Sequence, residues 1–315
     1  MDKQLEESQT IQQNLPKELF ERTNAEAHEA EKLGKSITFW KDVWLRFKSN
    51  KLAVFGIFLL FILGIMAWIG PSLTPYDYAT NDLTQANKAP SSEHWFGTDS
   101  LGRDVFTRIW HGARISLFIG LAAATIDLII GIIWGGLAGY LGKRTDEILM
   151  RIADILTAVP YLLVVILLMV VLEQGLTTMI IAMSITGWIN MARIVRGQVL
   201  QLKSQEYVLA AQTLGANTKR IMARHLVPNS MGPILITMTL TVPAAIFTEA
   251  FLSYLGLGVP APLASWGTMA SEGVPAMKYY PWQLFFPAIF ICLTIFAFNV
   301  VGDGLRDALD PRLRK

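Results

Sequence analysis

The sequence predicts an all-α membrane protein with six membrane-spanning helices. Of its 315 residues, 52% are hydrophobic and only 17% are charged, and the mean hydropathy is +0.40, which is too apolar for an ordinary soluble domain. Six segments approach the roughly 20 predominantly apolar residues that a helix needs to cross the hydrocarbon layer. The single cysteine, Cys292, excludes an internal disulfide, and the net charge of +2 gives no reason to expect nucleic acid as a partner.

Residues 1–51 are expected to form a cytoplasmic N-terminal extension. The part up to about residue 40 is polar, rich in Glu, Gln and Lys, and contains no apolar core of signal-peptide length. The apolar run 52–70 carries no charge, so it predicts an uncleaved first span. Three tryptophans lie near its ends, where interfacial anchors are common: Trp40, Trp44 and Trp68.

A long loop, residues 71–114, is expected between the first and second spans. Gly, Thr and Asp together favour a tight turn, and a glycine next to a charge pair gives the backbone a flexible point. The pattern therefore predicts an ordered extracytoplasmic loop. The residues that carry this prediction are Gly97, Thr98, Asp99, Gly102, Arg103 and Asp104.

Five further spans are predicted, and together they form a core that extends over residues 115–302. Gly131, Gly135 and Gly139 recur at every fourth position of the second span, which permits close approach of a neighbouring helix. Prolines at 160 and 243 are expected to kink the third and fifth spans. The predicted ranges are 115–141, 152–172, 175–192, 230–258 and 279–302.

The positions of Lys and Arg predict the orientation of these spans. Basic residues gather before the first span, between the second and third, between the fourth and fifth, and after the sixth. The alternate loops contain fewer basic residues, or dilute them with acids. We therefore expect both termini, including the tail 303–315, and the segment 204–229 to face the cytoplasm.

The segment 204–229 is a polar, helix-forming interruption between two apolar spans. Ser204 is expected to cap a short helix over 205–214, with Glu206 in its first turn, where the helix dipole favours an anion. Gly215 is expected to end this helix with a positive φ, and Pro228 to stop a second helix before the fifth span.

Small side chains make this segment a candidate docking surface. Ala210 and Ala211 leave the backbone open to close approach by another protein, although two amphipathic helices lying on the membrane would show a similar pattern. The candidate residues of the loop are Glu206, Tyr207, Ala210, Ala211, Gly215 and Pro228.

Two of these stretches resemble one family. The spacing of the Ala pair, Gly215 and Pro228 is similar to that of the loop through which the permeases of bacterial ABC importers receive force from their ATPases. The string FGTDSLGRDVFTRIWHGARISL resembles the signature of the dipeptide, oligopeptide and nickel group. The resemblance covers the chain from about residue 40 onward and implies a type I ABC importer permease fold with a cytoplasmic coupling helix. It also implies a multi-pass protein of the bacterial plasma (inner) membrane. The long first loop resembles that of the second, C-type permease.

The chain also departs from the family pattern. Leu209 stands directly before the Ala pair, where the family motif has a Glu, and His225 and Val227 stand where Ile and Leu are usual. The resemblance therefore implies no role for Glu206 equivalent to that of the family's acidic residue.

The chain is not expected to bind ATP, and it contains no candidate catalytic or metal-binding residues. A phosphate-binding loop needs Gly, four residues, and then Gly-Lys-Ser/Thr. Gly34-Lys35-Ser36 comes near, but Glu29 occupies the first glycine position. The resemblance implies two separate ABC ATPase subunits that bind ATP and Mg. It also implies a second permease forming a heterodimer and an extracytoplasmic substrate-binding protein.

The resemblance implies di- and oligopeptides or nickel as the substrate. Peptides are favoured over nickel, which remains the alternative, because no Met, His or Cys cluster indicates a metal pathway. An ion-coupled carrier would use buried ionisable residues, and Asp127 and Glu249 are the acids well inside the predicted spans. Asp127 is expected to pair with a neighbouring helix or to face a wet cavity, and Glu249 to lie near the outer surface. A membrane enzyme is disfavoured, because the four histidines show no metal-binding spacing.

Overall fold

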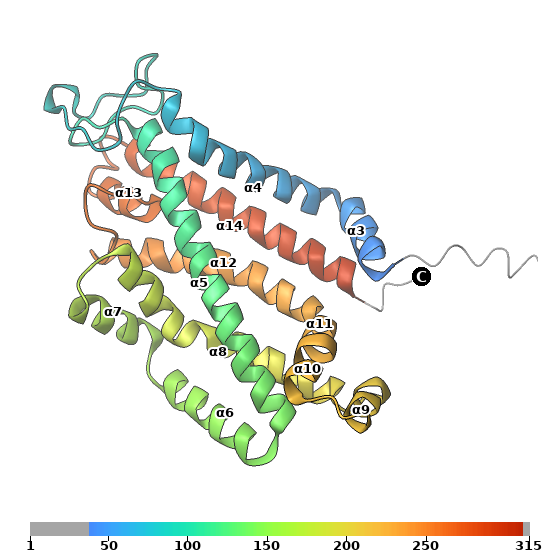
Figure 1. The fold of residues 1–315 in the computed structure, drawn as a ribbon. Helices are drawn as coiled ribbons and strands as arrows, with labels where there is room; N and C mark the ends of the chain where they lie inside the picture. Colours follow the sequence, from blue (N-terminus) through green and yellow to red (C-terminus); the bar gives the residue numbers. More distant parts are fainter. Residues whose placement is uncertain (1–37, 311–315) are drawn as a thin grey trace, which may run out of the picture. The chain divides into compact units, whose positions relative to one another are not determined.

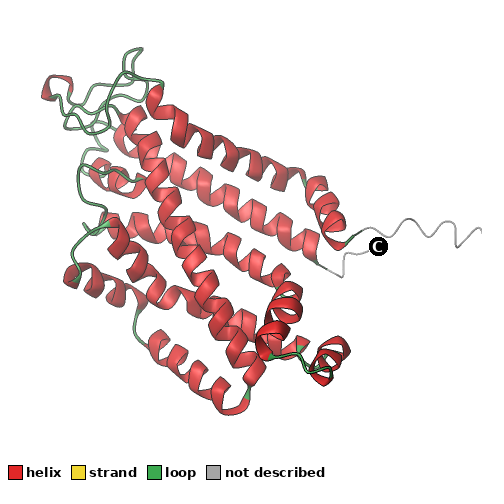
Figure 2. Ribbon diagram, in the orientation of Figure 1, coloured by secondary structure: helices red, strands yellow, loops and turns green. Residues whose placement is uncertain are grey.

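The computed structural model describes residues 38–310, which form helices joined by loops (Figure 2). The chain divides into two units, Met1–Trp44 and Leu45–Lys315. The described part of the first unit is the beginning of helix α3 (Phe39–Ser49). Most of the predicted N-terminal extension and the last five residues of the predicted tail lie outside the described residues.

Five described helices of the second unit are long and apolar enough to cross a membrane. They correspond to the first, second, fourth, fifth and sixth predicted spans, but the fourth and sixth continue well past their predicted ends. Hydropathy marks the apolar part of a helix, whereas the backbone hydrogen bonds continue into the polar segment that follows. The five helices are α4 (Lys51–Ile69), α5 (Val105–Leu141), α8 (Leu176–Leu202), α12 (Met231–Tyr254) and α14 (Trp282–Leu309).

The predicted third span, 152–172, is broken at Pro160, where a kink was expected. The region forms α6 (Lys143–Ala158) and α7 (Tyr161–Val171), whose axes are bent by 79°. Pro160 lies at the break, as expected for a kink, and it holds the preceding Val159 in an extended conformation (φ −84°, ψ 129°) that no helix continues through. If α6 and α7 count as one broken span, the described chain has six.

The second and fourth spans pack closely, as the repeated glycines predicted. A Cβ added at Gly131 would collide with the Met191 side chain, and one at Gly135 would collide with the carbonyl group of Ala192. Because only glycine fits there, α5 crosses directly over α8 (Figure 1). On the other side of α5, α14 packs against both α4 and α12.

A short helix, α13 (Trp266–Gly273), between the fifth and sixth spans was not predicted. Its first turn is fixed by a capping box in which Ser265 and Thr268 exchange hydrogen bonds. The Trp266 side chain is fully buried, and its indole Nε1 donates to the carbonyl oxygen of Ile109, 3.0 Å away. The helix is therefore attached directly to the start of α5.

Candidate functional site

The segment 204–229 forms two short helical pieces at one end of the bundle. The first is α9 (Glu206–Thr213), and Gly215 follows it with φ +80°, which confirms the expected glycine bend. The second is a continuous helical run made of α10 (Thr218–Ile221), the π-helical turn η4 (Met222–Leu226) and α11 (Val227–Asn229).

One detail of this segment differs from the prediction. Ser204 does not cap α9, because its hydroxyl donates backward to the Gln201 carbonyl and Gln205 occupies the cap position. Pro228 lies in the last turn of the continuous run, and the helix ends one residue later, at Asn229, just before α12 begins at Met231.

One buried side chain attaches α9 to the membrane spans. Val208 is fully buried and belongs to a cluster with Val199 of α8, Ile221 of α10 and Ile234 of α12. Each is inaccessible to solvent, and interiors packed this densely transmit displacement because they have little room to deform. A force on α9 would therefore reach two spans through Val208.

The rest of α9 presents an exposed, partly apolar face. Leu214 is 89% exposed, Leu209 is 48% exposed and Tyr207 is 41% exposed. Ala210 is exposed among them, whereas Ala211 is half-buried. α9 lies at the opposite end of the bundle from the loop that joins α4 to α5 (Figure 1).

The α4–α5 loop is ordered by two glycines with positive φ. Gly97 has φ +74° and Gly102 has φ +76°, conformations that favour glycine, and the chain turns at both positions. A Cβ at Gly102 would collide with the Asp82 carbonyl. Thr98 joins distant parts of the loop, because its hydroxyl donates to the Gln85 carbonyl and accepts from the Lys88 amide. Elsewhere in the loop, hydrogen bonds led by that from the Ala79 amide hold the pKa of Asp77 below its usual range.

The charged residues of this loop form a network with α13. The Arg103 guanidinium lies 2.7 Å from Asp99 and 2.9 Å from Glu272, and Arg108 lies 3.0 Å from the same Glu272 oxygen. The two arginines are buried, whereas the Glu272 side chain is 47% exposed, so the network reaches from the interior to the surface. Glu272 is far away in the sequence, and only the position of α13 brings it to this loop.

Asp104 does not pair with its neighbour Arg103. One carboxylate oxygen accepts from the backbone N–H and the hydroxyl of Thr107, both at 2.8 Å, and this caps α5. The other lies 2.8 Å from Nδ1 of His94. The carboxylate therefore fixes where the second span begins.

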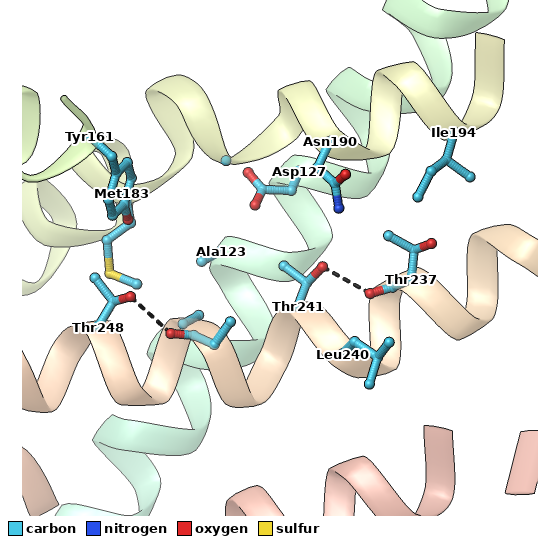
Figure 3. A pocket seen from close by; sticks show the side chains of 13 residues that line it. Ala123, Asp127, Tyr161, Met183, Asn190, Ile194, Thr237, Leu240, Thr241 and Thr248 are labelled. Carbon is cyan, nitrogen blue, oxygen red and sulfur yellow. Dashed lines mark hydrogen bonds between the residues drawn. The ribbon is translucent and has the colours of Figure 1, made fainter. Parts of the chain in front are cut away.

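A cavity of about 380 Å³ opens among α5, α7, α8 and α12, and the sequence did not identify it (Figure 3). Asp127 lines this cavity, and facing a cavity was one of the two expectations for this residue. The side chain is 5% exposed, and its Oδ1 atom is buried with no hydrogen-bond partner among the described residues. Asn190 and Tyr161 lie on the same side of the cavity, facing hydroxyl groups of α12 (Figure 3).

Glu249 lies little more than one turn before the end of α12, and it is fully buried in the protein. Its carboxylate accepts from the hydroxyls of Ser265 at 2.6 Å, Ser253 at 2.9 Å and Ser116 at 3.4 Å. These partners come from α5, α12 and the start of α13, so Glu249 joins three elements and offers no free group to a ligand.

The comparisons with known proteins agree over the whole chain. Residues 128–315 match the family described as "Binding-protein-dependent transport system inner membrane component". Residues 38–90 match the "N-terminal TM domain of oligopeptide transport permease C".

Two relatives from Bacillus subtilis (strain 168) are similar over nearly their full lengths. The oligopeptide transport system permease protein OppC is 69% identical over 304 residues, covering 96% of this chain and all of the relative. The dipeptide transport system permease protein DppC is 57% identical over 315 residues, covering 99% and 98%.

A solved chain of the MetNI methionine ABC transporter, in an inward-facing conformation, shares the fold. It aligns with a TM-score of 0.54 at 16% identity, covering 64% of this chain and 97% of that one. Fold, sequence relatives and family models thus agree, and the chain belongs to the binding-protein-dependent transport system inner membrane components, as an ABC importer permease of the dipeptide and oligopeptide group.

Proposed function

We propose that this chain is one of two permease subunits of an ATP-driven importer of di- and oligopeptides, and that α9 is its coupling helix. The observation that carries the coupling role is the combination of an exposed face on α9 with the buried Val208 anchor. The peptide substrate is supported by the names of relatives that are 69% and 57% identical to this chain.

The proposed complex contains a second permease, two ABC ATPases and an extracytoplasmic binding protein. ATP and Mg belong to the ATPases. The excess of basic residues in the loop that contains α9 supports a cytoplasmic position for it, since Lys and Arg favour that side. The α4–α5 loop then faces the binding protein.

The geometry supports a simple mechanism of coupling. An ATPase cleft that closes on α9 grips the exposed Tyr207, Leu209 and Ala210, while Val208 on the opposite face stays packed against α8 and α12. The bend at Gly215 returns the chain to α10, which belongs to the same packed cluster. A rotation of the ATPase therefore moves the spans as rigid elements.

Ala210→Glu tests the docking surface. Ala210 is exposed, so a Glu there leaves the fold intact while placing bulk and charge on the face that meets the ATPase. We expect the permease pair to reach the membrane normally but to lose ATPase co-purification and uptake of a labelled dipeptide by at least about tenfold, since a few kcal/mol of lost contact suffices.

Ala89→Glu is the matched control, because Ala89 is an exposed alanine in the α4–α5 loop at the other end of the bundle. It should retain ATPase association. Normal ATPase binding and uptake by Ala210→Glu would refute the coupling role. Wild-type cells that accumulate nickel and no peptide would instead refute the peptide substrate.

A further inference from the structure

The cavity beside Asp127 combines a buried carboxylate with a surplus of hydrogen-bond acceptors. Asp127 comes from the middle of α5, and one of its oxygens has no donor among the described residues. Ionisable side chains inside membrane spans are costly and usually serve a function, since an unpaired buried charge is strongly unfavourable.

The threonines opposite Asp127 also present acceptors. The hydroxyls of Thr237, Thr241 and Thr248 donate to carbonyl groups of their own helix, at 2.8 to 2.9 Å, and Figure 3 shows the bonds of Thr241 and Thr248. A hydroxyl has one hydrogen to donate, so each oxygen keeps acceptor capacity for a ligand. None of the described residues that line the cavity is Lys, Arg or His.

The space at Asp127 depends on a glycine. A Cβ at Gly187 of α8 would collide with the Asp127 carboxylate, so the bare backbone there lets the acid lie at the cavity wall. Apolar groups complete the lining, among them Met183, Ile194 and Leu240. A volume of about 380 Å³ is in the range of small-molecule sites and far larger than a single ion needs.

We propose that this cavity binds the protonated α-amino group of the transported peptide, with Asp127 as its counter-charge. The inference rests on the proposed peptide substrate and adds a binding point inside the membrane. An ammonium group is a donor-only cation, which matches a wall made of a free carboxylate and hydroxyl oxygens. The apolar lining leaves room for the peptide's first side chain.

The test is equilibrium binding of Ala-Phe and N-acetyl-Ala-Phe to the assembled permease–ATPase complex in nanodiscs, without nucleotide and without binding protein. The wild-type complex should bind the free amine at least about tenfold more tightly, as a charge-assisted hydrogen bond in a sheltered site allows. Asp127→Asn should abolish this preference, and Thr241→Val, which keeps the shape, should reduce it.

Asp154→Asn is the matched control, since Asp154 is an exposed acid on α6 that pairs with Arg193 outside the cavity, and it should keep the preference. Equal binding of both peptides by the wild type, or an unchanged preference in Asp127→Asn, would overturn the inference. So would a loss that is equal for both peptides and depends on sodium, because the site would then hold an inorganic cation.

Peptide uptake by the complete transporter, binding protein included, separates the two proposals. If the wild type takes up peptide but Asp127→Asn still prefers the free amine, the cavity proposal is refuted and the proposed function stands. No peptide uptake by the wild type removes the proposed function and the cavity site with it.

Discussion

Asp104 connects the α4–α5 loop to the second span through one carboxylate. One oxygen receives two hydrogen bonds from Thr107 at the start of α5, and the other contacts His94, which stacks on Tyr76. The Asp side chain is 1% exposed, so removing it leaves the Thr107 backbone N–H without its partner in a site that water does not reach, whereas the Thr107 hydroxyl keeps its contact with Thr74.

Asp104→Ala should therefore lower the stability of the permease by about 1–3 kcal/mol, the combined cost of a lost helix cap and an unsatisfied buried donor. Thermal unfolding of the purified complex in detergent measures the effect. Glu93→Ala, at an exposed acid of the same loop, is the control and should change stability by less than about 0.5 kcal/mol. Equal melting temperatures for Asp104→Ala and wild type would contradict the capping role.

The α5–α8 contact is the close helix approach that the glycine pattern of the second span predicted. At Gly135 the backbone of α8 approaches so closely that a methyl group has no room beside the Ala192 carbonyl. In a membrane, where lipid is as apolar as leucine, such close packing holds helices together in place of the hydrophobic effect.

Gly135→Ala should destabilise the bundle by about 1–3 kcal/mol, because the two helices must separate to admit the Cβ. Gly64→Ala is the matched control, since Gly64 lies within α4 and an added Cβ there meets nothing within 4 Å. Its melting temperature should stay level or rise slightly, because alanine is the better helix former. If the two alanine variants unfold at the same temperature, the glycines do not set this contact.

At the scale of the whole molecule, the bundle separates two specialised ends. The ion network of Arg103, Arg108 and Glu272 lies at the end formed by the α4–α5 loop and α13, and α9 lies at the other (Figure 1). The distribution of basic residues predicts that the α9 end faces the cytoplasm.

This orientation predicts the labelling of single cysteines in a Cys292→Ser background. A membrane-impermeant maleimide should react in intact cells with Ser92→Cys in the α4–α5 loop, and with Thr213→Cys on α9 only after permeabilisation. Both native side chains are exposed, so burial does not limit either reaction. The unlabelled Cys292→Ser protein gives the background. Labelling of Thr213→Cys in intact cells would show that α9 lies on the outer side of the membrane and would contradict the predicted orientation.

The sequence alone determined the helical class, the approximate positions of the spans, the glycine contacts of α5 and the bend at Gly215. These follow from hydropathy and from backbone conformation, which are properties of short stretches of chain. It also pointed to the loop residues from Gly97 to Asp104, but not to their partners. In the structure Arg103 contacts Asp99 and Glu272, and Asp104 contacts His94.

Only the tertiary structure decided which distant residues meet. The attachment of α13 to the start of α5, the Val208 anchor and the cavity around Asp127 depend on contacts between elements far apart in the chain. Hydropathy could place Asp127 and Glu249 in spans. It could not show that three serine hydroxyls donate hydrogen bonds to the Glu249 carboxylate, or that one oxygen of Asp127 has no partner among the described residues. Local patterns specify which segments cross the membrane, whereas side-chain partners are set by how those segments pack.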